Sequence, residues 1–279
     1  MSTQTLERAI GLIRLLATGG TEGCRLVDLQ LTSGLTKPTV HRILDTLKQQ
    51  GMVEQLEDSR RYRLGQELAV LGWSANRTVY DLKELAAEDL AAVAAKTGDT
   101  GFLSIRSGTE AVCIDRQAGS YPVKAFTVEV GTRRPLGVGA TGVALLAALA
   151  PDEAEVVLDA VKGNLARFPN AGLRQIRAAV ERARRDGYAL SEGLMLKGVS
   201  GVAVVIRDSA GRPIAGIGTA AITDRMPPAR MPEIVRVLRL HANHVEQRIA
   251  TAESGTGTGS VRRFRAAAGR TVASHKRSK

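Results

Sequence analysis

The chain has 279 residues, of which 44% are apolar, and this is enough for two domains that each bury a core. No run approaches the roughly 20 apolar residues that span a bilayer, and the first residues lack the basic-then-apolar order of a signal peptide. The formal net charge of +11 is uneven, because residues 252–279 hold seven Lys or Arg against one Asp or Glu. With two isolated cysteines, Cys24 and Cys113, these features predict a cytoplasmic protein that has no membrane segment.

The first 51 residues have the pattern of a helix-turn-helix. Residues 5–17 place apolar side chains on one face, and residues 25–33 predict a second, short helix that ends before Gly34. A third helix is predicted to begin at Thr36, a good N-cap, with Pro38 in its first turn and Gly51 as its C-terminal stop.

The third helix divides into an apolar and a polar face. Its apolar stripe consists of Val40, Ile43, Leu44 and Leu47. The polar side chains near its start could read base edges in a major groove, and we expect the following residues to contact DNA: Thr36, Lys37, Pro38, Thr39, His41, Arg42 and Thr46. An ordinary amphipathic surface helix has the same pattern, so the neighbouring segments decide.

Two short β-prone runs, residues 52–56 and 61–64, flank a turn that contains Arg60. Three helices followed by a basic hairpin predict a winged helix-turn-helix domain over residues 1–65, with a linker helix over residues 66–77. Arg42 is predicted to read a base, and Thr39 and Thr46 to contact base edges or phosphates. Lys37, Arg60 and Arg61 are predicted to position phosphates of double-stranded DNA, at a pseudo-palindromic operator.

Residues 78–253 predict a second domain of α+β class, in outline like a GAF-type sensor fold. Its helices are expected from Asp81, as the cap, to Lys96, and at 141–150, 152–161, 173–185 and 232–252. Its strands are expected at 100–106, 111–116, 123–128, 188–190, 201–207 and 213–222. Residues 254–279 are predicted to be a disordered basic tail, which either adds weak, salt-sensitive affinity for polyanions or has no specific role.

Three stretches resemble the IclR-type bacterial transcriptional regulators over about residues 4–251. They are residues 5–10 leading into 34–42, residues 131–147, and residues 187–189 followed by 201–208. The resemblance implies a winged-helix domain, a linker helix and an effector-binding domain for small molecules, commonly carboxylates. It also implies homodimers that pair into tetramers.

The resemblance also assigns an effector site, at positions that match Ala140, Thr141, Ser191, Gly201, Gly218 and Ala220. The better-studied carboxylate sensors of this family are more polar at the last four positions. Glycine and alanine leave space there and remove hydrogen-bond partners. This argues against a two-carbon oxoacid and favours a bulkier acid, aromatic or with an apolar body.

Residues 137–142 form a GxGxxG sequence, but a dinucleotide-binding turn needs a hydrophobic strand before it and a second strand, ending in an acidic residue, about 20 residues on. Here residues 133–135 precede the motif and a second predicted helix follows it. The helix start at Ala140 and Thr141 would still favour an anion, although glycines that merely allow close packing explain the motif equally well. His241 and His244 lie three apart, but no third metal ligand is visible in the sequence. Since the sequence has no HExxH, GxSxG or P-loop motif, we expect no enzyme, no cofactor and no metal.

The sequence therefore predicts a sequence-specific transcriptional regulator that a small organic acid controls, with a repressor favoured over an activator. Two alternatives stay open. In the first, the winged helix is fused to an enzyme domain that uses a nucleotide cofactor, and bound nucleotide in the purified protein would reveal it. In the second, the winged helix is a protein-interaction module, and absence of salt-dependent DNA binding would support it.

Overall fold

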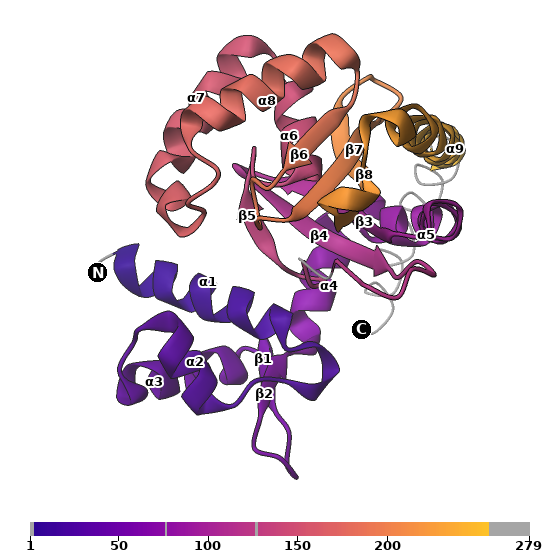
Figure 1. Ribbon diagram of the computed structural model, residues 1–279. Helices are drawn as coiled ribbons and strands as arrows, with labels where there is room; N and C mark the ends of the chain where they lie inside the picture. Colours follow the sequence, from indigo (N-terminus) through magenta and orange to yellow (C-terminus); the bar gives the residue numbers. More distant parts are fainter. Residues whose placement is uncertain (1–2, 76, 126–127, 257–279) are drawn as a thin grey trace, which may run out of the picture. The chain divides into compact units, whose positions relative to one another are not determined.

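The computed structural model describes residues 3–75, 77–125 and 128–256, and these divide into two compact units (Figure 1). The first unit contains the described residues up to Glu84, with Val112–Ile114 and Val128–Arg133. The second unit contains the rest. None of the helices in the described ranges is long and apolar enough to cross a membrane.

The first unit is a three-helix domain with a hairpin. It contains α1 (Thr3–Thr18), a 3-10 turn (Gly20–Glu22), α2 (Leu26–Ser33), α3 (Lys37–Gln49), β1 (Val53–Gln55), β2 (Tyr62–Leu64) and α4 (Gln66–Ala75). Its core is formed by apolar residues of all three leading helices, among them Leu12, Leu29 and Leu44. The predicted helices, hairpin and linker helix are confirmed, with ends that differ by one to two residues.

The ends of α3 follow the predicted signals only in part. Thr36 is the N-cap residue, but its side chain makes no capping hydrogen bond to the backbone. Its hydroxyl instead lies 2.9 Å from that of Thr39. At the other end, Gly51 adopts a left-handed φ of 67°, as predicted, and its N–H donates to Lys48 O.

The second unit contains most of a six-stranded sheet with the order β5-β4-β3-β8-β7-β6, of which Val112–Ile114 in β4 and Arg133 in β5 belong to the first unit. Its strands are β3 (Thr100–Ser107), β4 (Glu110–Gln117), β5 (Arg133–Pro135), β6 (Ala189–Glu192), β7 (Val199–Arg207) and β8 (Pro213–Ile222). The pairs β3–β8, β7–β8 and β6–β7 are antiparallel. Antiparallel strands with helices between them place the unit in the predicted α+β class.

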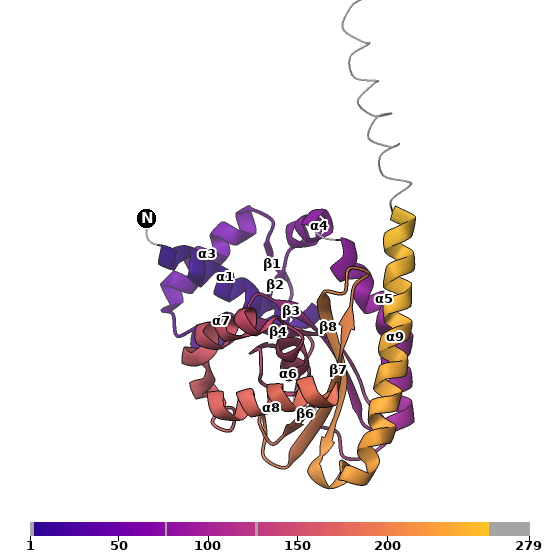
Figure 2. The ribbon, with the colours of Figure 1, turned by 90° about the horizontal axis from the view of Figure 1, so that it is seen from above.

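Helices cover both faces of this sheet (Figure 2). One face carries α9 (Met231–Thr256) and α5 (Arg77–Thr97). Helix α5 lies close to the sheet: a Cβ atom at Gly101 of β3 would lie 3.1 Å from the Leu90 side chain. The other face carries α6 (Ala140–Ala147), since a Cβ atom at Gly216 would lie 3.3 Å from that of Thr141. Outside α6 lie α7 (Pro151–Val161) and α8 (Leu173–Asp186), and 3-10 segments span Lys162–Arg167, Thr223–Arg225 and Pro228–Arg230.

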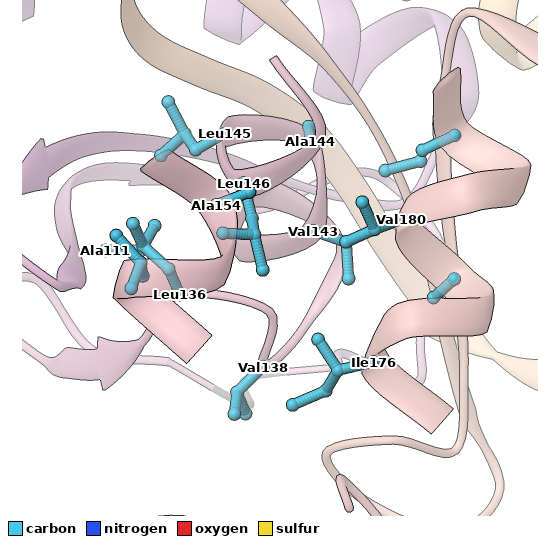
Figure 3. Close-up of a cluster of buried hydrophobic side chains, with 14 of the residues drawn as sticks. Ala111, Leu136, Val138, Val143, Ala144, Leu145, Leu146, Ala154, Ile176 and Val180 are labelled. Carbon is cyan, nitrogen blue, oxygen red and sulfur yellow. The ribbon is translucent and has the colours of Figure 1, made fainter. Parts of the chain in front are cut away.

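The core on the α6 side is continuous from the sheet to α7 and α8 (Figure 3). Val143 and Leu146 of α6, together with Ile176 and Val180 of α8, are almost fully buried in it. This packing holds the start of α6 in a fixed position on the sheet.

Three predictions about the chain beyond α4 are wrong. Residues 123–125 and 128 are not in a strand, and β5, a three-residue strand that ends in Pro135, is a sheet edge that the sequence analysis missed. Helix α5 begins at Arg77, so Asp81 lies inside it and is no cap. Helix α9 continues to Thr256, so the predicted tail begins within a helix, and residues 257–279 lie outside the described residues.

Candidate DNA-binding surface and effector site

The outward face of α3 forms a shallow hollow of about 540 Å³. It is lined by Lys37, Pro38, His41, Arg42, Asp45, Thr46 and Gln49. Five of the residues predicted to contact DNA therefore share one surface, while Val40, Ile43, Leu44 and Leu47 are buried on the opposite face. The hydrophobic stripe orients the helix, and its polar side stays accessible.

Individual side chains on this face differ in how they are held. Arg42 is exposed, and its backbone carbonyl accepts a hydrogen bond of 3.0 Å from the Thr46 hydroxyl. The carboxylate of Asp45 lies 2.9 Å from Nδ1 of His41, one turn away on the helix. Asp45 belongs to this surface as well, because it lines the hollow. Its carboxylate repels phosphates but can accept a hydrogen bond from the amino group of cytosine. Thr36 and Thr39 complete it at the helix start.

The hairpin between β1 and β2 carries the other predicted phosphate contacts. Arg60 is exposed at its tip and has a left-handed φ of 58°. Gln55 Nε2 donates to Arg60 O at 3.1 Å, which holds that backbone conformation. Arg61 differs, because its Nη1 donates to Gly23 O at 3.3 Å. Arg60 is therefore the more accessible cation of the two.

The predicted effector residues lie on the sheet face that α6 covers. Ser191 of β6 pairs with Gly201 of β7, Gly201 with Ala220 of β8, and Ala220 with Thr100 of β3. These four residues form one straight row across the sheet, and Gly218 belongs to the next row, opposite Phe102. Cross-strand partners point to the same face, so the register brings together all four predicted positions on the sheet.

The first turn of α6 lies on these rows. Gly139 is its N-cap residue, with a φ of 77°, and the first bond of the helix runs from Val143 N to Gly139 O at 2.9 Å. The N–H groups of Ala140 and Thr141 precede that bond, so they belong to the donors that a helix start leaves for other partners. The Thr141 hydroxyl donates to Ser104 Oγ at 3.3 Å.

The expectation that the small residues leave space is wrong at two positions. A Cβ atom at Gly201 would lie 3.3 Å from the Cβ of Ala140, so α6 already fills this place. A Cβ atom at Gly218 would lie 2.5 Å from Val202 O, because the neighbouring strand is too close. Glycine is needed at Gly218 for strand packing, with or without a ligand.

The structure adds polar and apolar groups that the sequence analysis missed. Thr100 is 1% exposed, and within the described residues its Oγ1 has no hydrogen-bond partner. Ser104 is the buried partner of Thr141. The sulfur of Met195 would lie 3.5 Å from a Cβ atom at Gly139, beside the start of α6. Alternation along the strand at 100, 102 and 104 was the signal that could have placed these side chains on the α6 face.

Two family models match the chain. The model described as "IclR helix-turn-helix domain" matches residues 5–57, and the model described as "Bacterial transcriptional regulator IclR C-terminal" matches residues 76–247. The chain belongs to the IclR family of bacterial transcriptional regulators. The winged helix-turn-helix, the α+β second domain and the role of transcriptional regulator are thereby confirmed.

Relatives of this IclR-family regulator agree with the assignment. It is 29% identical to the HTH-type transcriptional regulator XynR of Escherichia coli, over 82% of this chain and 90% of XynR. The crystal structure of an IclR transcriptional regulator from Alicyclobacillus acidocaldarius matches with a TM-score of 0.66 and 25% identity, over 88% of this chain and 99% of that one. An IclR homologue from Microbacterium hydrocarbonoxydans, solved in complex with 4-hydroxybenzoate, has the same fold, with a TM-score of 0.65 and 24% identity over 87% of this chain and 98% of that one.

Gly137, the first glycine of the GxGxxG sequence in this IclR-family regulator, serves packing. A Cβ atom at Gly137 would lie 2.5 Å from the Ile176 side chain, and Gly137 has a φ of 92°. After α6 the chain continues into α7 and α8, whereas a dinucleotide-binding unit needs a parallel strand there. The relatives are transcriptional regulators.

Proposed function

We propose that this IclR-family regulator binds a pseudo-palindromic operator as a homodimer, with α3 of each copy in a major groove. The exposed polar face of α3, with Arg42 at its centre, is the observation that carries the proposal. Arg42 reads a guanine, and Thr39 and Thr46 contact base edges or phosphates. Two copies require half-sites about 10 bp apart, or a multiple of that spacing.

A mobility-shift experiment on the DNA upstream of the protein's own gene tests this. The wild-type band should survive an excess of random competitor DNA. Arg42→Ala should lose about 1–3 kcal/mol of binding free energy and its preference at one base pair. Arg174→Ala, an exposed arginine of α8, is the matched control and should bind as the wild type does. If competitor DNA removed the wild-type and the Arg42→Ala complexes equally, the proposal would be contradicted. Absence of any DNA binding would favour a protein-interaction module.

The effector of the proposed site is an organic acid with an apolar or aromatic body. Its carboxylate accepts hydrogen bonds from the N–H groups of Ala140 and Thr141 at the start of α6. Its body lies against Met195 and the row of Ser191, Ala220 and Thr100. The buried Thr100 hydroxyl, which has no hydrogen-bond partner among the described residues, can form a hydrogen bond with it. The 4-hydroxybenzoate complex of the Microbacterium homologue supports an acid of this size.

Equilibrium binding of 4-hydroxybenzoate and glyoxylate tests the effector class. The aromatic acid should bind the full-length protein more tightly than the two-carbon acid. Thr141→Val should weaken its binding, because the variant keeps the shape of the side chain and loses the hydroxyl. Ser209→Ala, in the turn between β7 and β8, is a control and should bind normally. Tighter binding of glyoxylate would overturn this assignment.

We further propose that the protein acts in the cytoplasm as a repressor. Repression requires only that the protein occupies its operator, whereas activation requires a further contact with RNA polymerase. A reporter gene behind the operator should therefore be expressed more strongly when the regulator is deleted. Lower expression on deletion would identify an activator.

A further inference from the structure

A cluster of side chains between α5 and α9 lies outside both sites described above. The two helices run side by side on the sheet face opposite α6 (Figure 2). Asp89 of α5 lies against the paired histidines of α9: its Oδ1 is 2.6 Å from Nδ1 of His241 and 3.2 Å from Nδ1 of His244. The fold thus brings a carboxylate to a histidine pair that has no third ligand nearby in the sequence.

The cluster is buried at one end and open at the other. The side chains of Asp89 and His241 are 5% and 7% exposed, and that of His244 is 44% exposed. Burial, with the positive charges of Lys96 and His244, lowers the pKa of His241 and favours its neutral ring. Nε2 of His241 is buried without a hydrogen-bond partner among the described residues. Hydrogen bonds alone therefore do not satisfy the whole cluster.

We propose that Asp89, His241 and His244 bind a zinc ion. Two imidazoles and a carboxylate are a donor set that Zn²⁺ uses, with bonds of about 2.0–2.2 Å. Tetrahedral ligands at that bond length lie about 3.3 Å apart. The three ligand atoms already lie within 4.8 Å of one another, so small side-chain movements complete the geometry. The exposed side of His244 leaves the fourth position to water.

Arg248, one turn after His244 on α9, shapes this site. Its Nη2 contacts Oδ2 of Asp89, whereas both histidine contacts are made to Oδ1. This contact fixes the carboxylate and leaves Oδ1 for the metal, as partners of metal ligands commonly do. The guanidinium also repels a divalent cation, so the affinity should be lower than that of a site without a neighbouring positive charge.

The expected consequence of zinc is a tighter attachment of α5 to α9. An ion that binds only the folded protein raises its melting temperature, and the rise grows with the logarithm of the ion concentration divided by its dissociation constant. Because α6 and its sheet face lie on the other side, zinc binding should be independent of the effector acid.

Zinc content of the full-length protein without an affinity tag tests the proposal. The protein is stripped with a chelator, dialysed against ZnCl₂ and then against buffer, and its zinc is measured by atomic absorption. The wild type should retain about one more zinc ion per chain than His244→Ala. His41→Ala removes an exposed histidine of α3 and is the matched control, which should retain as much zinc as the wild type.

Two further readouts distinguish this site from binding at the cysteines or elsewhere. Circular dichroism should show that His244→Ala is folded, and Asp89→Asn, which keeps the shape of the carboxylate, should lose the same equivalent of zinc. ZnCl₂ should raise the melting temperature of the wild type and of His41→Ala, and leave that of His244→Ala unchanged. Equal zinc content in wild type and folded His244→Ala, or no zinc in the wild type, would overturn the proposal.

Discussion

At the scale of single residues, Arg60 combines backbone strain with an accessible charge. A left-handed φ of 58° costs a residue with a Cβ atom about 1–2 kcal/mol, and glycine avoids this cost. Arg60→Gly should therefore raise the free energy of unfolding by about 1 kcal/mol and weaken DNA binding for all sequences alike. Urea unfolding and the salt dependence of the mobility shift measure the two effects, and the salt slope should fall by about one.

A matched comparison isolates the charge from the backbone effect. Arg60→Lys keeps the positive charge and the strain, so its stability and its salt slope should stay close to those of the wild type. Arg61→Ala also removes a positive charge and should weaken binding of all sequences, but it loses the hydrogen bond to Gly23 O as well. Loss of sequence preference in Arg60→Gly would mean that Arg60 reads bases, contrary to the proposal.

Two glycines of the effector face differ in what surrounds them. A Cβ atom at Gly218 meets a backbone oxygen at 2.5 Å, whereas one at Gly201 meets the Ala140 side chain at 3.3 Å. Gly218→Ala should cost about 1–3 kcal/mol of unfolding free energy, and Gly201→Ala should stay within about 1 kcal/mol of the wild type. Chemical denaturation without ligand checks this order. Equal stability of Gly218→Ala and the wild type would mean that the glycine leaves real space.

At the scale of elements, the turn between β7 and β8 depends on one carboxylate. The Asp208 side chain is 4% exposed, and it accepts hydrogen bonds from Ala210 N at 3.1 Å and from Arg212 N and Nε at 2.8 and 2.7 Å. Burial opposes ionisation of Asp208, but the hydrogen bonds and charge of Arg212 outweigh it and hold the pKa below its usual value.

The direction of this shift predicts how stability depends on pH. A carboxyl with a lowered pKa in the folded state stabilises the protein above its unfolded pKa of about 3.9, and this contribution is lost as pH falls through the folded pKa. Asp208→Asn keeps an oxygen acceptor for the turn but does not ionise. Between neutral pH and about pH 3, the melting temperature of the wild type should fall further than that of the variant. Parallel curves would contradict this role of Asp208.

How well an element could be predicted depends on the length of its pattern. Apolar residues at helical spacing identified α1, α3 and α8, and long apolar runs identified β7 and β8. The three residues of β5 are too few to show alternation, and one of them is a proline. Val123 and Val128 are β-branched and favoured the prediction of a strand over residues 123–128. Residues 123–125 and 128 are nevertheless not in a strand, because β-propensity yields to tertiary context.

At the scale of the whole molecule, the register of distant strands decides what the sequence cannot show. The row of Ser191, Gly201 and Ala220 was predicted only through the family resemblance, and Thr100 joins it because β3 pairs with β8 across 120 residues of chain. The approach of Asp89 to His241 is of the same kind, since the two residues are 152 positions apart in the chain. Periodicity within one element carries no information about such pairs.

The two functions of this IclR-family regulator must be coupled if an effector controls transcription. Coupling between two sites is reciprocal. If the acid changes the affinity of the protein for the operator by a given factor, bound operator DNA must change the affinity of the protein for the acid by the same factor. With 4-hydroxybenzoate as the acid, we expect a factor of about 5–150, typical of such systems. Titration calorimetry with and without saturating operator measures one factor, and mobility shifts with and without the acid measure the other.

Arg42→Ala should leave the affinity for the acid in the absence of DNA unchanged, because Arg42 lies in the DNA-binding unit. Unequal factors would mean that the acid also acts at a second site, and a factor of one in both experiments would mean that it is not the effector.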